Sequence, residues 1–136
     1  MERVDPRGWG VLSMKSRDAS LRQKRFKVED CERRLGQIDA MIEEFSRMAA
    51  DLEHEIAAEK RRTGIEDEKH FAYSTFARAA GQRRENLLAS VDDLNRQREA
   101  AQAALETARA ELQREEGRLG RENPGTAPSG HGRLAS

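Results

Sequence analysis

The residues that most often carry chemistry in proteins are few in this chain. The three histidines are His54, His70 and His131, and the single cysteine is Cys31. A metal site needs several such ligands clustered in space, and no helical spacing brings these residues together. Cys31 falls in an apolar helical pattern, where a free thiol acts as a small hydrophobic side chain rather than a nucleophile. We therefore expect no metal site and no reactive cysteine.

Motifs for cofactors and catalysis are missing as well. The sequence contains no GxxxxGK[ST] phosphate loop, and its glycine-rich segment GTAPSGHG follows no strand and opens no helix. The many carboxylates are spread along charged helical faces, with no sign of a cleft that would pair or desolvate two of them. We predict that the chain needs no cofactor and is not an enzyme.

The composition is typical of long helices rather than of a broad globular core. Hydrophobic residues are 36% of the chain and charged residues 37%, against roughly 45–50% and 25% in ordinary soluble domains. The formal net charge is zero, which gives no bulk electrostatic argument for nucleic acid or a membrane surface. No segment approaches the roughly 20 apolar residues of a membrane span, and residues 1–13 lack the apolar run of a signal peptide. We expect a cytoplasmic protein that does not insert into a membrane.

Two heptad arrays, with a and d as the core positions, predict an all-α fold: a long two-helix antiparallel coiled-coil hairpin with disordered termini. In the first array the a positions are Leu21, Val28, Leu35, Ile42, Ala49 and Ile56, and the d positions are Lys24, Cys31, Ile38, Phe45, Leu52 and Glu59. In the second the a positions are Ala77, Arg84, Val91, Arg98, Leu105, Leu112 and Leu119, and the d positions are Ala80, Leu87, Leu94, Ala101, Ala108 and Glu115.

Glycine and proline mark the predicted boundaries. Thr63-Gly64 interrupts the first array, and Gly64 is a natural helix C-terminal cap. The predicted parts are an irregular, disordered arm (1–13), a hairpin (14–122) made of a first helix (about 16–62), a connector (63–72) and a second helix (about 73–120), and a disordered tail (123–136). Met14 opens the helical pattern and is a candidate start codon. An antiparallel register that pairs Ile42 with Leu94 gives full core layers, and a seven-residue slip gives acceptable layers too.

Aromatic residues near the connector are candidate partner-binding residues. Phe71, Tyr73 and Phe76 lie at the start of the predicted second helix. They either lock the tip of the hairpin or, where they point outward, anchor a partner. Met41 and Met48 flank Phe45, and they either pad the core or form an adaptable binding face.

Charge is distributed unevenly along the first helix. Residues 15–27 contain six basic residues and one acidic residue, whereas residues 51–70 contain seven acidic and four basic residues. The basic segment is either a solvated helix face or a site for an acidic protein partner. Nucleic-acid binding is a weaker interpretation, because Phe26 is the only aromatic residue in the basic segment.

Three segments resemble the FliJ family of flagellar export proteins. They are MKSRDASLRQKRFKVEDCERRLGQI, MIEEFSRMAADLEHEIAAEKRRTGI and HFAYSTFARAAGQRRENL. The resemblance covers roughly residues 14–120, and its most specific part is the Gly64-Ile65 turn followed by the aromatic-rich segment. Residues 1–13 and 123–136 have no counterpart. Ser46, Ala49 and Glu53 stand where a more aromatic face is expected.

The resemblance implies a stalk-like coiled coil in the cytoplasm, peripheral to the inner membrane at the flagellar base. Its implied partners are the hexameric flagellar export ATPase, the large cytoplasmic domain of the export gate, and export chaperones. Weak self-association is a further option, and no nucleic acid is implied. The residues implied for the ATPase are Arg22, Lys24, Arg25 and Lys27, and those implied for the gate are Phe45, Phe71, Tyr73 and Phe76.

Other interpretations remain open at this point. The equivalent stalk protein of a virulence-type type III secretion system would have much the same sequence pattern. A coiled-coil hairpin chaperone or adaptor, similar to prefoldin, would also use apolar tip residues, although prefoldins need a β segment and no strand pattern is present. An RNA-binding coiled-coil arm is the weakest interpretation, for want of a continuous basic face.

Overall fold

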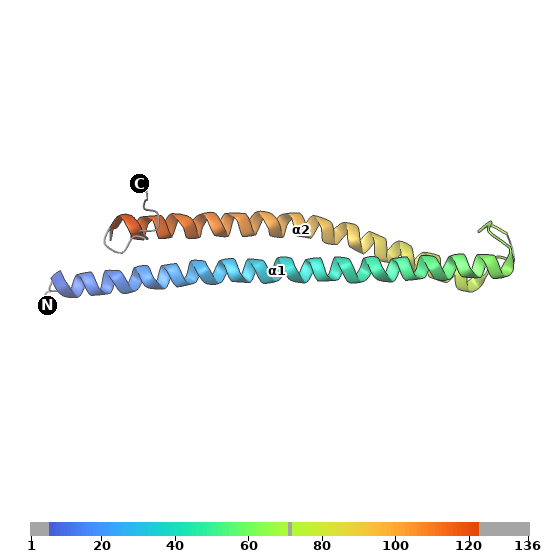
Figure 1. Cartoon of the computed structure of the whole chain (residues 1–136), viewed down its shortest axis with the longest axis horizontal. Helices are drawn as coiled ribbons and strands as arrows, with labels where there is room; N and C mark the ends of the chain where they lie inside the picture. Colours follow the sequence, from blue (N-terminus) through green and yellow to red (C-terminus); the bar gives the residue numbers. More distant parts are fainter. Residues whose placement is uncertain (1–5, 71, 123–136) are drawn as a thin grey trace, which may run out of the picture. The chain divides into compact units, whose positions relative to one another are not determined.

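The computed structural model describes residues 6–70 and 72–122, with side chains from residue 15 to residue 121 except 71. It contains helix α1 (Pro6–Thr63) and helix α2 (Thr75–Glu122), and no strand in the part it describes. The chain divides into two compact units: unit 1 takes residues 1–33 and 102–136, and unit 2 takes residues 34–101. In each unit a stretch of α1 and a stretch of α2 run side by side in opposite directions (Figure 1). The predicted helical hairpin is confirmed.

Helix α1 begins at Pro6, earlier than the predicted start near residue 16. Proline is well placed in the first turn of a helix, because the N–H it lacks would have no partner there and its φ angle is already helical. Gly8 and Gly10 each cost about 1 kcal/mol in a helix, which weakens the helix without ending it. The predicted irregular arm is therefore wrong for residues 6–13. Residues 1–5 and the predicted disordered tail lie outside the described residues.

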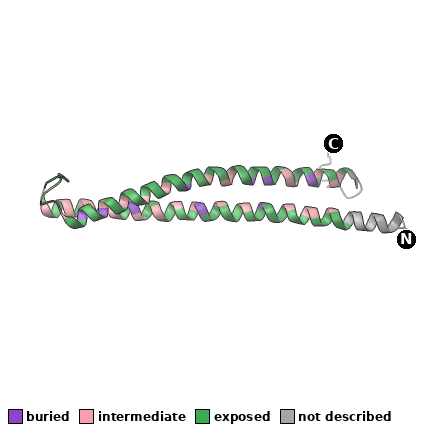
Figure 2. Ribbon diagram, turned by 180° about the vertical axis from the view of Figure 1, so that it is seen from behind, coloured by how far each residue is buried: buried purple, intermediate pink, exposed green. Residues whose placement is uncertain are grey.

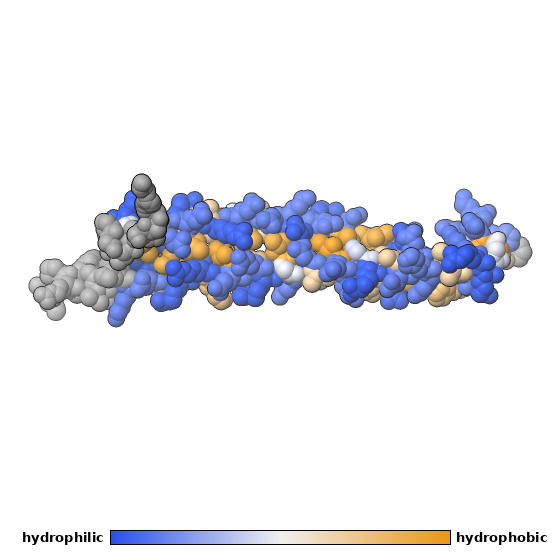
Figure 3. Space-filling view, viewed as in Figure 1, coloured by the Kyte–Doolittle hydropathy of each residue, from blue (hydrophilic) through white to orange (hydrophobic). Residues whose placement is uncertain are grey.

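The heptad assignment is confirmed in both units. Every residue assigned to an a or d position is buried or half-buried. Figure 2 shows buried and half-buried stretches on the sides where the two helices of a unit face each other. The most buried apolar residues of unit 2 include Ile38, Ala77 and Leu94, and those of unit 1 include Leu105 and Ala108. Figure 3 shows apolar side chains gathered along the line between the helices, with hydrophilic ones outside. The core is thus a narrow strip, as the composition predicts.

Two polar core residues of unit 2, Arg84 and Arg98, form ion pairs along one edge. The Arg98 guanidinium donates to Asp39, with Nε 2.5 Å from Oδ1, and this contact raises the pKa of Arg98. Arg84 Nη2 lies 3.2 Å from Glu53 Oε1. The predicted register would place Arg98 opposite Ile38, the residue just before Asp39. The observed ion pair therefore agrees with that register.

Two more ion pairs join the helices of unit 1. Arg109 Nη2 lies 3.3 Å from Glu32 Oε2, and Arg25 Nη2 lies 3.9 Å from Glu116 Oε2. All four residues occupy e positions, which border one edge of an antiparallel heptad core. A seven-residue slip of α1 in either direction would replace Arg25 with Asp18 or with Glu32, and both would repel Glu116. The apolar pattern is compatible with the observed register and with a seven-residue slip. The charge pattern favours the observed register.

Candidate partner-binding sites

The connector at the tip of unit 2 is built from caps on both helices. Gly64 has a φ of 75° and its N–H donates to Lys60 O at 2.8 Å, which closes the end of α1. Ser74 Oγ accepts a hydrogen bond from Ala77 N at 3.2 Å, which caps the start of α2. The predicted C-terminal cap at Gly64 is therefore confirmed.

Glu59 connects the last turn of α1 to the capping residue of α2. Its carboxylate accepts hydrogen bonds from Arg62 Nε at 3.1 Å and from Arg62 Nη2 at 2.8 Å. The hydrogen bond from Arg62, followed by one from the Ser74 side chain, lowers the pKa of Glu59 from 4.5 to about 2. Because Ser74 also caps α2, the Glu59 carboxylate interacts with residues at both helix ends.

We expect the Glu59 carboxyl to titrate with a midpoint near pH 2 in the folded protein. A group whose folded pKa lies below its unfolded pKa stabilises the fold above the unfolded pKa, and that stabilisation is lost as the pH falls through the folded pKa. Its contribution is therefore present above about pH 4.5 and is lost on acidification toward about pH 2. Carboxyl-detected NMR titration measures this midpoint. Arg62→Ala should raise it, whereas Arg61→Ala, an exposed neighbour, should not; an unchanged midpoint in Arg62→Ala would refute the assignment.

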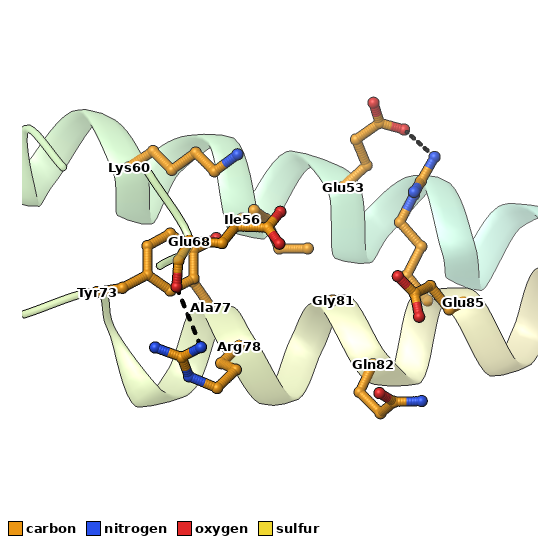
Figure 4. A pocket seen from close by; sticks show the side chains of 11 residues that line it. Glu53, Ile56, Lys60, Glu68, Tyr73, Ala77, Arg78, Gly81, Gln82 and Glu85 are labelled. Carbon is orange, nitrogen blue, oxygen red and sulfur yellow. Dashed lines mark hydrogen bonds and ion pairs between the residues drawn. The ribbon is translucent and has the colours of Figure 1, made fainter. Parts of the chain in front are cut away.

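Tyr73 is buried at the tip, with 7% of its surface exposed. The Arg78 guanidinium lies 5.3 Å from the centre of the Tyr73 ring, and its Nη1 donates to the Glu68 carbonyl oxygen at 3.2 Å. Figure 4 shows Tyr73 and Arg78 at one end of a groove of about 280 Å³, with Gly81 further along it. A Cβ atom added at Gly81 would meet nothing within 4 Å, so the groove is open there.

The residues that the family resemblance implies for the gate differ in how far the structure exposes them. Phe45 is half-buried in the heptad core and Tyr73 is buried, whereas Phe76 is 52% exposed. Phe71 lies outside the described residues. Of the three described aromatics, Phe76 is the one that offers most of its ring to a partner. The burial of Tyr73 instead favours the alternative in which it locks the tip of the hairpin.

Phe76 shares an edge of unit 2 with two methionines. Met41 is 45% exposed and Met48 is half-buried. All three residues occupy g positions, which border the edge of the heptad core opposite the e positions. We call Met41, Met48 and Phe76 the apolar edge. The described ion pairs between the two helices of unit 2 lie on the other edge.

The basic residues assigned to the ATPase also differ in their surroundings. Lys24 is half-buried at a core position, in a hollow lined by Glu111 and Arg114 among others. Arg25 pairs with Glu116. Arg22 and Lys27 are exposed, and neither makes an ion pair with another residue in the described part of the chain. Two of the four cations are therefore available to a partner.

Phe26 is a surface residue that the sequence analysis did not assign to a site. It is 62% exposed, more than any other large hydrophobic residue that the structure describes. The Arg33 guanidinium lies 5.7 Å from the centre of its ring. The available signal was its heptad position, because Phe26 occupies an outward f position where no core contact explains an aromatic side chain.

The described residues contain no group of three or more His, Cys, Asp and Glu side chains that could hold a metal ion. In the same part of the chain, neither helix has a stretch apolar enough to cross a membrane. A scan against protein-family models, a search of curated proteins and a search of solved structures each found no match to this chain.

Proposed function

We propose that this chain is a non-enzymatic, stalk-like component of the flagellar type III export apparatus. In this role it links the hexameric export ATPase to the large cytoplasmic domain of the export gate and contacts export chaperones. It would act in the cytoplasm, at the inner-membrane side of the flagellar base. The observation that supports the proposal most is a helical hairpin whose tip carries the FliJ-like segment after Gly64, with one aromatic buried and one exposed.

The exposed residues suggest how each partner would be contacted. The apolar edge of unit 2 would meet the gate, because exposed aromatics and methionines are common anchors in adaptable interfaces. The exposed cations of unit 1, Arg22 and Lys27, would meet the ATPase. Arg25 already pairs with Glu116 and Lys24 is half-buried at a core position, so both would contribute less.

The proposal is tested with the cognate flagellar export ATPase. Adding the full chain should raise the ATPase activity or promote ring assembly, and the two proteins should co-purify. Arg22→Glu with Lys27→Glu should weaken both effects. Arg83→Glu, an exposed arginine of unit 2 without an ion pair in the described residues, is the matched control. No stimulation and no co-purification would refute the proposal.

The equivalent stalk protein of a virulence-type secretion system is the second candidate, since its fold and partners would have the same chemistry. The assay above separates the two when it is run with both kinds of ATPase. A hairpin chaperone is favoured by one observation, the exposure of Phe76 near the tip. That alternative predicts suppressed aggregation of an unfolded client, lost in Phe76→Ala, with no effect on either ATPase.

A further inference from the structure

The outer face of α1 in unit 1 carries an aromatic side chain that packs against no core. Phe26 is covered on one side by Arg33, which Asp30 Oδ1 holds in place with a 3.2 Å contact to Nη2. The other side opens onto a shallow hollow. We call this surface the Phe26 patch, and it is lined by Ser16, Ala19, Ser20, Arg22, Gln23 and Phe26.

Small side chains stand about two and three helical turns before Phe26, at the far end of the hollow. Ala19 lies two turns before it on the same face, with Ser16 and Ser20 beside Ala19. These three side chains are too short to reach the ring, and Phe26 stays 62% exposed although the longer Arg22 and Gln23 stand one turn before it. An apolar side chain of a partner therefore has room to lie against Phe26 from this side.

The open side of the ring is bordered by positive charge. Arg22 precedes Phe26 by one turn and lines the hollow, whereas Lys27 follows Phe26 on the neighbouring side of the helix. Both are exposed and make no ion pair within the described residues. Of the nearby acids, Glu29 and Asp30 lie on the side that Arg33 covers, and Asp30 is already bonded to Arg33. Asp18, one turn before Arg22, is exposed and does not line the hollow. A carboxylate from a partner would thus find the Arg22 guanidinium next to an apolar contact.

We propose that the Phe26 patch binds an acidic amphipathic helix of a partner protein. One apolar side chain of that helix lies in the hollow against the Phe26 ring, and a neighbouring carboxylate bonds to Arg22. Large aromatic side chains that are desolvated on binding dominate interface energetics, while charges at the rim guide association.

Other occupants fit the patch less well. Residues 123–136 contain no Asp or Glu, so the C-terminal tail lacks the charge that the patch selects. A nucleic acid would need a continuous basic track, and Glu29, Asp30 and Glu32 interrupt the basic residues on the following turns. The inference shares Arg22 with the proposed ATPase contact, but it centres on Phe26, which the family resemblance leaves unassigned, and its peptide assay uses no export component.

The test uses the full chain and two short helical probe peptides with the same leucine spacing, one flanked by glutamates and the other by lysines. In calorimetric titration the glutamate peptide should bind and the lysine peptide should not. Phe26→Ala and Arg22→Glu should each weaken binding about ten-fold or more. Leu88→Ala and Arg83→Glu are the matched controls on unit 2, since Leu88 and Arg83 are exposed and belong to no proposed site, and they should leave binding unchanged.

Several results would overturn the inference. They are a lack of binding by the glutamate peptide, equal binding by both peptides, and undiminished binding by Phe26→Ala. Tighter binding of a single-stranded RNA oligonucleotide would assign the patch to nucleic acid instead. A wild-type dimer that Phe26→Ala dissociates would assign it to a second copy of the chain. Because Phe26 is 62% exposed, the variant should keep its helicity, which circular dichroism checks.

Discussion

Leu94→Ala should lower the free energy of unfolding by about 2–5 kcal/mol, because it removes a core side chain and leaves a cavity. Leu94 is 5% exposed and lies in the heptad core of unit 2. Leu88 lies on the same helix but is 37% exposed, so Leu88→Ala should change the free energy by less than about 1 kcal/mol. Urea unfolding followed by far-UV circular dichroism measures both values.

The size of the Leu94 effect follows from the shape of the core. In a two-helix hairpin a core residue contacts the facing helix and its own neighbours, and no third element closes over the gap. Because the total stability of a small protein is only about 5–15 kcal/mol, a loss of a few kcal/mol is a large part of it. Equal destabilisation by Leu88→Ala and Leu94→Ala would mean that the heptad core does not hold unit 2 together.

Tyr73→Ala should destabilise the tip of unit 2 by about 3 kcal/mol, whereas Phe76→Ala should leave its stability unchanged within about 0.5 kcal/mol. Tyr73 is buried and Arg78 lies over its ring, while Phe76 is half exposed. Amide hydrogen exchange should speed up in the connector and the first turns of α2 for Tyr73→Ala alone. Binding to the gate domain should fall for Phe76→Ala, although that variant is fully folded.

These single variants separate the two roles that the sequence left open for the tip aromatics. Tyr73→Phe is the conservative control, and it should keep both the packing and the exchange rates. If Tyr73→Ala folds normally and loses partner binding, the tip-locking role is wrong for Tyr73. If Phe76→Ala unfolds the tip, its exposure in the structure does not describe its role in solution.

The fold could be predicted from the sequence because a single periodicity determines it. The a and d positions of both arrays include Lys24, Glu59, Arg84, Arg98 and Glu115, and these polar residues are buried or half-buried as well. Their aliphatic stems can lie along the core while the charged groups reach its edge. The cap at Gly64 was equally predictable, because glycine readily adopts the positive φ that ends a helix there.

The candidate sites could be predicted only in part. Periodicity does not predict that Tyr73 is buried and Phe76 exposed, because their exposure depends on how the connector folds over the start of α2. The sequence pattern also did not predict that α1 begins at Pro6, because proline and glycine usually indicate the end of a helix even though a first helical turn tolerates them. Phe26 was not assigned to a site because it occupies neither an a nor a d position, and the hollow beside it becomes visible only in the structure.

The ion pairs along one edge of each unit have a mechanical consequence. A coiled coil that relays a signal by sliding one helix past the other needs two registers of similar free energy. Here a slip by one heptad would leave Glu116 facing another acid, and in one direction it would bring Lys60 to Arg84. Force applied to one helix should therefore pass to the other as tension rather than be dissipated by slippage.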